Sequence, residues 1–339
     1  MNHKILDQLD RPCKDLRISV TNRCQFRCRY CLPAEHIDVM RAQSAPENNL
    51  SFEEITASVA AFAAIGVTKV RLTGGEPLLR KNLKDLVRDI KAIDGIEDIA
   101  LTTNGALLPP VLNDLIGAGL DRITISLDAI DDDLFKDITG TKHTAKEILD
   151  VIELCNQSSI KQVKINTVVQ KGINEHQVLP ILDHFRGSRV VVRFIEFMDV
   201  GNINKWQEAK VLPSADVLKI IEKHADFESK TPTSKGEVAK RYSFSDGSGE
   251  FGMISSISQP FCSDCNRARL SADGQVFTCL FTAQGHDLKP LLNQTESLNH
   301  FVKNIWQQRD DQYSAQRHDQ DNGKNKSNLP KIEMFVMGG

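Results

Sequence analysis

The chain has 339 residues, of which 40% are hydrophobic and 26% charged, a composition that can build a sizeable core and excludes a disordered protein. The net charge of −3 and the pI near 6.3 exclude a strongly basic nucleic-acid binder, so an anionic substrate would need a local cluster of arginines. The first twelve residues are charged where a signal peptide needs an apolar core, and the most apolar stretch, residues 59–67, is far shorter than the ~18 residues of a membrane span. We therefore expect a cytoplasmic protein with no membrane and no nucleic-acid partner.

The first part of the chain alternates short β-branched runs with amphipathic helical segments. Six strands are expected, over residues 16–20, 67–72, 98–103, 122–127, 162–169 and 190–197. Helices are expected over residues 51–65, 83–93, 111–116, 145–155 and 176–185. The first helix opens with a capping box, in which Ser51 and Glu54 satisfy each other's backbone N–H groups. Six β–α units in series predict parallel strands with right-handed crossovers, in either an open doubly wound sheet or a barrel.

Polar and glycine residues gather where four of these strands end. The clusters occupy residues 73–76, 102–105, 126–128 and 196–198. Open α/β sheets and barrels both place their chemistry at this edge of the sheet. The repeated pattern favours a barrel-type active site.

Beyond Gly201 the β–α rhythm stops. A helix over residues 215–223 leads into a Gly/Ser/Phe-rich region at 241–258, and a second helix is expected over residues 298–306. A polar stretch at 307–328 then precedes an apolar segment that ends in Gly338-Gly339. We expect two domains: a barrel over residues 1–200, and a smaller C-terminal domain over residues 201–339 packed on it.

Six of the eight cysteines fall into two triplets, a clustering that indicates metal binding in a reducing compartment. The first triplet, Cys24-x3-Cys28-x2-Cys31, follows the first expected strand. Three thiolates can hold three irons of a 4Fe–4S cluster and leave the fourth iron open. A structural zinc site is the alternative, but it would need a fourth ligand, and no Cys or His follows at zinc spacing.

This spacing, with Tyr30 before the last cysteine, resembles the radical S-adenosylmethionine (SAM) superfamily. The GGEP sequence at Gly74–Pro77 is similar to the superfamily motif that receives the SAM amino group, and Ser126 and Met198 match SAM-binding positions. The resemblance implies a SAM pocket formed by Tyr30, Gly75, Ser126 and Met198. It also implies that SAM chelates the open iron and is cleaved by one electron to methionine and a 5′-deoxyadenosyl radical.

The second triplet has the spacing Cys262-x2-Cys265-x13-Cys279. Taken alone, it fits a zinc site completed by His286 as well as it fits a second cluster. Two arginines, Arg267 and Arg269, lie next to these thiolates. A structural zinc site does not need them, whereas a cluster that faces a polyanionic substrate does.

The resemblance then extends along the whole chain to the GTP 3′,8-cyclase family of molybdenum cofactor biosynthesis. The matching segments are RISVTNRCQFRCRYC, VRLTGGEPLLR, TTNG, ISLDA, KINTVV, RFIEFMDVGN, FCSDCNRARLSADG and the terminal GG. The resemblance implies an α/β fold, a partial TIM-type (βα)6 barrel whose smaller C-terminal domain carries a second 4Fe–4S cluster that binds guanine. The implied reaction converts GTP to (8S)-3′,8-cyclo-7,8-dihydroguanosine 5′-triphosphate. An electron donor would reduce the cluster, and a cyclic pyranopterin monophosphate synthase would use the product.

The same resemblance supplies residues for GTP. The matching positions are Arg17, Lys69, Arg71, Thr102, Lys164, Arg193, Arg267 and Arg269. Arginine suits a triphosphate because it binds phosphate oxygens bidentately. Alternation along one strand puts Lys69 and Arg71 on a common face, which we expect to point into the barrel.

The C-terminal Gly338-Gly339 is expected to be functional rather than frayed. The preceding residues 332–337 are apolar enough to dock, and glycine enters spaces that are closed to any side chain. The resemblance implies that this tail enters the active site near three catalytic arginines, Arg17, Arg267 and Arg269.

Two rival functions stay open at this point: a radical SAM enzyme that modifies a peptide with the help of an auxiliary cluster, and a non-catalytic zinc-binding or redox-sensing protein. Cys13 and Cys155 belong to neither triplet, and Cys155 continues an apolar helical stripe, so we expect it in the core. The sequence does not determine the oligomeric state, for which a homodimer is one alternative.

Overall fold

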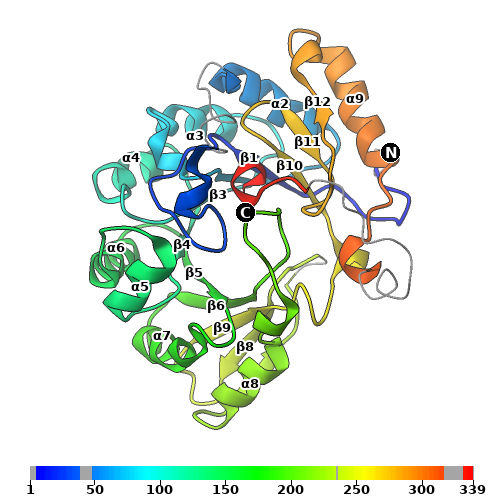
Figure 1. Cartoon of the computed structure of the whole chain (residues 1–339). Helices are drawn as coiled ribbons and strands as arrows, with labels where there is room; N and C mark the ends of the chain where they lie inside the picture. The colour runs from blue at the N-terminus through cyan, green and yellow to red at the C-terminus, as the bar shows by residue number, and fades with distance from the viewer. Residues whose placement is uncertain (1–4, 39–47, 234–235, 317–330, 339) are drawn as a thin grey trace.

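Six parallel strands curve into a partial barrel in the computed structural model, which describes residues 5–38, 48–233, 236–316 and 331–338 (Figure 1). The strands are β1 (Asp15–Ser19), β2 (Lys69–Thr73), β3 (Asp98–Thr103), β4 (Arg122–Ser126), β5 (Gln162–Val169) and β6 (Val191–Glu196). Each pairs in parallel with the next strand in chain order. This order has no reversal point, as in a barrel and unlike a doubly wound sheet. The six predicted strands and the barrel-type fold are confirmed.

Helices cover the outer face of this sheet (Figure 1). Five lie where the sequence predicts them: α2 (Phe52–Ala64), α3 (Leu83–Lys91), α4 (Leu112–Gly117), α6 (Ala145–Gln157) and α7 (Val178–Phe185). The predicted capping box is present, because Ser51 Oγ accepts from Glu54 N at 3.1 Å and Ser51 N donates to Glu54 Oε2 at 2.7 Å. A further helix, α5 (Asp132–Thr139), was not predicted, since its eight residues are too few for a clear apolar period.

The C-terminal part of the chain extends the same sheet at both edges. At one edge β10 (Arg267–Leu270) pairs in parallel with β1, and β11 (Gln275–Phe277) and β12 (His286–Asp287) continue antiparallel. At the other edge β9 (Glu250–Ile254) pairs in parallel with β6, and β8 (Lys240–Phe244) and β7 (Phe227–Lys230) follow antiparallel. Within the described ranges, twelve strands therefore form one sheet. The two later helices, α8 (Ser214–Glu222) and α9 (Thr295–Gln307), agree with their predicted positions.

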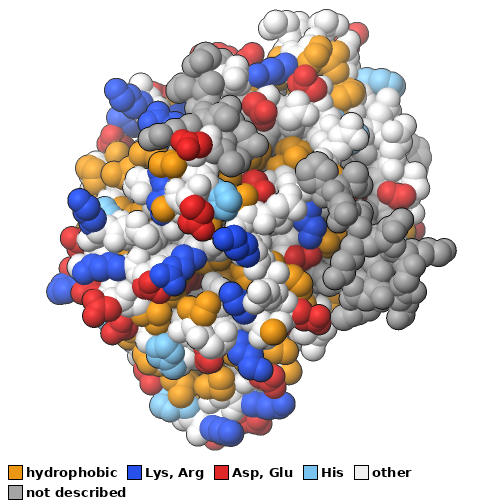
Figure 2. Space-filling model, in the orientation of Figure 1, with side chains coloured by type: hydrophobic (Ala, Val, Ile, Leu, Met, Phe, Trp, Pro, Cys, Tyr) orange, Lys and Arg blue, Asp and Glu red, His pale blue; other side chains and the backbone are white. Residues whose placement is uncertain are grey.

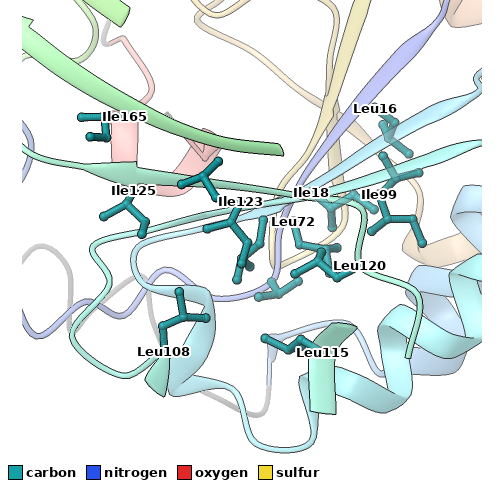
Figure 3. Close-up of a cluster of buried hydrophobic side chains, with 14 of the residues drawn as sticks. Leu16, Ile18, Leu72, Ile99, Leu108, Leu115, Leu120, Ile123, Ile125 and Ile165 are labelled. Atoms are coloured by element: carbon teal, nitrogen blue, oxygen red, sulfur yellow. The ribbon is translucent and has the colours of Figure 1, made fainter. Parts of the chain in front are cut away.

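The main core lies between the sheet and the outer helices (Figure 3). Leu16 and Ile18 of β1 and Leu72 of β2 are fully buried on this side, where Leu115 of α4 also packs. Side chains alternate along a strand, so the residues between them point the other way, into the barrel. Cys155 is fully buried in this core, as predicted, and so is Cys13.

The surface and the inside of the barrel differ in charge. On the face seen in Figure 2, Lys and Arg side chains are interspersed with Asp and Glu. Among the residues that the structure describes, no helix combines the length and the apolar character needed to cross a membrane. Along the inside of the barrel, by contrast, Lys and Arg side chains from several strands outnumber the carboxylates.

Candidate active site

A cavity of about 890 Å³ runs through the barrel and joins the two cysteine triplets. All six triplet cysteines line it. So do the predicted SAM-pocket residues Tyr30, Gly75, Ser126 and Met198, and the predicted GTP residues Arg17, Lys69, Arg71, Thr102, Lys164, Arg193, Arg267 and Arg269. Segments more than 200 residues apart in the chain therefore meet around one space.

The first triplet lies in the loop that follows β1, and this loop is anchored by backbone hydrogen bonds. Arg27 N donates to Thr139 O at 2.8 Å and Arg29 N donates to Ile138 O at 3.0 Å, which ties the loop to the end of α5. The Arg27 guanidinium also donates to Cys24 O at 2.6 Å. Helix α5, which the sequence did not predict, thus holds the cysteine loop in place.

The GGEP segment packs against the same loop in close backbone contact. Gly75 N donates to Thr21 O and Glu76 N to Arg23 O, both at 2.7 Å. A Cβ at Gly75 would lie 2.3 Å from Arg23 O, so any side chain there would displace the cysteine loop. This close approach explains why glycine occupies the position.

Glu76 and Asn104 are polar neighbours of Cys24 that the sequence analysis did not single out individually. The buried Glu76 carboxylate accepts from Thr103 Oγ1 at 2.7 Å and from Asn104 N at 2.8 Å, while Asn104 Nδ2 lies 3.9 Å from Cys24 Sγ. Burial raises the pKa of Glu76 to about 7 despite these hydrogen bonds. The signal was present in the strand-end clusters at 73–76 and 102–105, but their mutual contact depends on the fold.

Asp128, which belongs to the predicted strand-end cluster at 126–128, is another pocket residue for which the sequence predicted no individual role. Tyr30 Oη donates to Asp128 Oδ2 at 2.7 Å, and Val168 N donates to Asp128 Oδ1 at 2.8 Å. Burial raises the pKa of Asp128 to about 6. The hydrogen bond orients the Tyr30 ring at the cavity wall beside the first triplet.

Three arginines on adjacent strands form a row across the lumen. Arg17 of β1 is in register with Arg71 of β2 on one side and with Arg269 of β10 on the other. Directly opposed like charges destabilise a sheet. Burial, together with the neighbouring Arg269, Arg267 and Arg71 charges, holds the pKa of Arg17 well below its ordinary value. Asp15 at the start of β1 offsets part of this positive charge, and an anionic ligand would offset more of it.

Only some of the hydrogen-bond donors of the lumen arginines have partners in the described part of the protein. Arg71 Nη1 donates to Thr102 Oγ1 at 3.1 Å and to Thr124 Oγ1 at 3.2 Å, and Arg193 Nη2 donates to Thr124 Oγ1 at 3.3 Å. The buried Nε atoms of Arg17, Arg71, Arg193 and Arg267 have no hydrogen-bond partner within the described residues. Unpaired buried donors are costly and rare. They fit a ligand rich in acceptor oxygens.

Burial also lowers the pKa of two further lumen cations. Burial, with the Arg193, Arg122 and Arg71 charges, lowers the pKa of Lys164 to about 7. Burial, with the Arg71 and Arg122 charges, lowers the pKa of Arg193 to about 9. A bound polyanion would reverse both effects.

The second triplet lies in a more positive environment. Arg267 Nη2 is 3.4 Å from Cys265 Sγ. Burial acts to raise the pKa of Cys265, but the Arg267 and Arg309 charges outweigh it and lower this pKa to about 6. His286, the fourth ligand in the zinc alternative, is exposed on β12 and does not line the cavity. Over the described ranges, no three His, Cys, Asp or Glu side chains meet closely enough to hold a single metal ion.

The C-terminal tail reaches the row of arginines. Helix α11 (Met334–Met337) packs on β1, and the last described residue, Gly338, is buried. Arg269 Nη1 donates to Gly338 O at 2.9 Å and to Met337 O at 3.3 Å. Gly338 has φ +65°, and a Cβ there would lie 2.3 Å from Thr73 Cγ2, so both its conformation and its surroundings require glycine. Gly339 and residues 317–330 of the polar stretch lie outside the described residues.

Comparisons with known proteins give consistent similarities over the whole chain. The profile of the "Radical SAM superfamily" matches residues 18–185, and the profile "Molybdenum Cofactor Synthesis C" matches residues 190–315. A GTP 3′,8-cyclase of Xanthomonas campestris pv. campestris (strain 8004) is 47% identical over 334 residues, which cover 98% of this chain and 97% of that protein. A GTP 3′,8-cyclase of Staphylococcus epidermidis (strain ATCC 35984) is 45% identical over 343 residues, covering 100% of both chains.

Proposed function

The chain belongs to the GTP 3′,8-cyclase family of the radical SAM superfamily, and from that membership we propose which of its residues carry each part of the reaction. It is a radical SAM enzyme that uses a 4Fe–4S cluster and SAM and converts GTP in the biosynthesis of the molybdenum cofactor. Family membership rules out the peptide-modifying enzyme and the non-catalytic sensor considered above.

The first triplet is assigned to the cluster that binds SAM. Three cysteines of one anchored loop line the cavity, a ligand set that suits a cluster with one open iron. When bound, this cluster and SAM supply a 5′-deoxyadenosyl radical. Tyr30, held by Asp128, and Gly75, Ser126 and Met198 form the pocket wall for SAM.

The lumen cations are assigned to the GTP triphosphate. Arg71, Arg193 and Lys164 approach from three strands, and Lys69 and Thr102 lie beside Arg71 on the same wall. Their role is to bind and orient the nucleotide so that its ribose faces the SAM pocket. Fixed geometry of this kind is the main contribution that a protein makes to cofactor-driven chemistry.

The second triplet is assigned to a second 4Fe–4S cluster that holds the guanine base. Arg17, Arg267 and Arg269 are assigned catalytic roles next to it, together with Gly338 and Gly339 of the tail. The contact of Arg269 with Gly338 O supports this assignment, because it links a cavity-lining arginine to the tail. With the base and the triphosphate held at separate points, the reacting ribose carbon and guanine C8 would be fixed relative to each other.

One observation carries these assignments: a row of three arginines, in which the buried Nε–H groups of Arg17 and Arg71 have no partner within the described residues, lies in one cavity that joins two cysteine triplets. Anaerobic incubation with SAM, a reductant and GTP, followed by mass spectrometry of the nucleotide, tests the function directly. Formation of 3′,8-cyclo-7,8-dihydro-GTP is expected. SAM cleavage with no change in GTP would contradict the substrate assignment, and iron near four rather than about eight per chain would contradict the second cluster.

The proposal also divides the chain into two parts. Residues 1–200 would form the SAM-binding barrel and residues 201–339 the part that carries the second cluster, a division supported by the change of family profile between residues 185 and 190.

The proposal extends to the compartment and the partners of the enzyme. Eight free cysteines suit a reducing, cytoplasmic setting. A one-electron donor would reduce the enzyme, a cyclic pyranopterin monophosphate synthase would consume its product, and a homodimer stays one alternative for its assembly.

A further inference from the structure

Two buried arginines, Arg11 and Arg309, hold the backbone of the second triplet from outside the cavity. Arg11 Nη1 donates to Cys262 O and Arg309 Nη1 donates to Cys265 O, each at 2.7 Å. Neither arginine lines the cavity, so neither is placed to touch GTP. Arg267, in contrast, lines the cavity.

Asp7 joins the two arginines. Its Oδ2 accepts from Arg11 Nε at 2.6 Å and from Arg309 Nη1 at 3.3 Å, and the three side chains are at most 2% exposed. The backbone around them is also cross-linked: Gln8 N donates to Arg309 O at 3.1 Å, and Trp306 Nε1 donates to Arg11 O at 3.0 Å. The N-terminal segment and the end of α9, side by side in Figure 1, thus meet at this network.

The charges of this network do not balance within the protein interior. Two guanidinium groups share one fully buried carboxylate, and Asp311, which lies 3.2 Å from Arg309 Nε, is 25% exposed and therefore screened by solvent. Arg11 Nη2 is buried with no hydrogen-bond partner in the described part of the chain. A buried net positive charge is unfavourable unless a negative group lies close by. An anionic, thiolate-bound cluster on Cys262 and Cys265 would be that group.

We propose that Arg11 and Arg309 are positioning residues for the second cluster: they hold its ligand loop and make its reduction easier, and Asp7 limits the strength of their charge. The inference rests on the second cluster of the proposed function. The potential of a 4Fe–4S cluster depends on nearby charge, hydrogen bonding and solvent exposure, and reduction adds one negative charge, which buried cations favour. The electron itself comes from the external one-electron donor.

A redox titration followed by EPR tests this role. The parent is the full-length chain with Cys24, Cys28 and Cys31 replaced by Ala, so that only the second cluster is reducible. In this background, Arg309→Gln should lower the ratio of reduced to oxidised cluster at a fixed potential about tenfold, a midpoint about 59 mV more negative for one electron. Arg309→Lys, which keeps the charge, should stay closer to the parent. Asp7→Asn should shift the midpoint in the opposite direction, because it removes a negative charge.

A matched control distinguishes this shift of the midpoint potential from a general loosening of the fold. Arg189 also donates hydrogen bonds to backbone oxygens, but at the end of α6, away from both triplets. Its acceptors, at 2.8–3.0 Å, are the carbonyl oxygens of Cys155, Asn156, Ser158 and Ile160. Arg189→Gln should leave the midpoint unchanged. An unchanged midpoint in Arg309→Gln, or shifts of the same sign in Arg309→Gln and Asp7→Asn, would overturn the inference. If Arg309→Gln loses its cluster, the sign of the Asp7→Asn shift decides. A parent that binds no iron would instead refute the second cluster itself.

Discussion

The two cysteine triplets use the same donor atoms, but only the second has a thiol whose pKa is lowered by neighbouring arginines. Burial raises the pKa of Cys24 to about 11 and of Cys31 to about 12, and the neighbouring carboxylates are Glu76 for Cys24 and Glu333 for Cys31. In the second triplet the pKa of Cys265 is lowered to about 6, because Arg267 and Arg309 outweigh the effect of burial, whereas burial raises the pKa of Cys279 to about 12. A setting with carboxylates suits the amino group of SAM, whereas arginines beside Cys265 suit the polyanionic substrate whose base the second cluster is assigned to hold. The contrast indicates that the surroundings, more than the ligands, distinguish a cofactor site from a substrate site.

The largest effect is expected at the first triplet. Replacing Cys24, Cys28 or Cys31 with Ala should abolish formation of 5′-deoxyadenosine, because two thiolates cannot hold the cluster that binds SAM. Iron should fall by about half if the second cluster survives independently. Product analysis and iron determination on anaerobically purified variants measure both quantities. Retained SAM cleavage in any of the three variants would refute the assignment.

The second triplet should respond differently. Replacing Cys262, Cys265 or Cys279 with Ala should eliminate GTP cyclisation but leave some uncoupled SAM cleavage, since the first cluster is intact. His286→Ala is the matched control, and it should change neither the iron content nor the cyclisation. Loss of metal in His286→Ala would show that a three-cysteine, one-histidine zinc site was the correct interpretation.

A third prediction distinguishes the residues that bind GTP from those that bind SAM in the shared cavity. Arg71→Ala and Arg193→Ala should each weaken GTP binding by roughly 2–3 kcal/mol, the loss of a charge-assisted contact with phosphate. SAM binding should hardly change. Calorimetry with each ligand measures both, and Arg88→Ala, which removes an exposed arginine paired with Asp85, is the control. Equal losses for GTP and SAM would mean that these arginines support the fold.

The tail tests whether the row of arginines acts in catalysis. Deleting Gly338 and Gly339 should lower GTP conversion at least about tenfold, equivalent to ~1.4 kcal/mol, and leave iron content and SAM binding intact. Gly338→Ala should show a milder defect, because the added methyl group would meet Thr73 Cγ2. Thr73→Ser removes that methyl contact, so the double variant should recover part of the loss. Unchanged turnover after the deletion would show that the tail has no role in catalysis.

The smallest predicted effect is a pH dependence of GTP binding. The pKa of Lys164 is about 7 in the free enzyme, chiefly because of burial, and a bound polyanion would raise it. Lys164 must then take up a proton on binding, so GTP affinity should fall as pH rises above 7, by about fivefold from pH 7 to pH 8. Comparing the pH profiles of the wild type and Lys164→Met separates this effect from titration of GTP. Identical profiles would contradict the role of Lys164.

The amino-acid sequence by itself determined the elements that depend on local pattern. The six strands follow from β-branched runs, and the start of α2 follows from the pairing of Ser51 with Glu54, which involves neighbouring residues only. The triplet spacings identified the cysteines, and the strand alternation put Lys69 and Arg71 on one face. Helix α5 was not predicted because eight residues give too little periodicity. Strands β8 and β9 were not predicted because their region shows no β–α alternation.

Only the tertiary structure decided which of these residues meet. The parallel pairing of β10 with β1 brings Arg269 beside Arg17, and nothing local in either segment specifies that register. The same holds for the buried network of Asp7, Arg11 and Arg309, whose members come from the two ends of the chain. Contacts between distant segments depend on how a whole sheet closes around its core, so a local pattern can name the chemical groups of a site but not their partners.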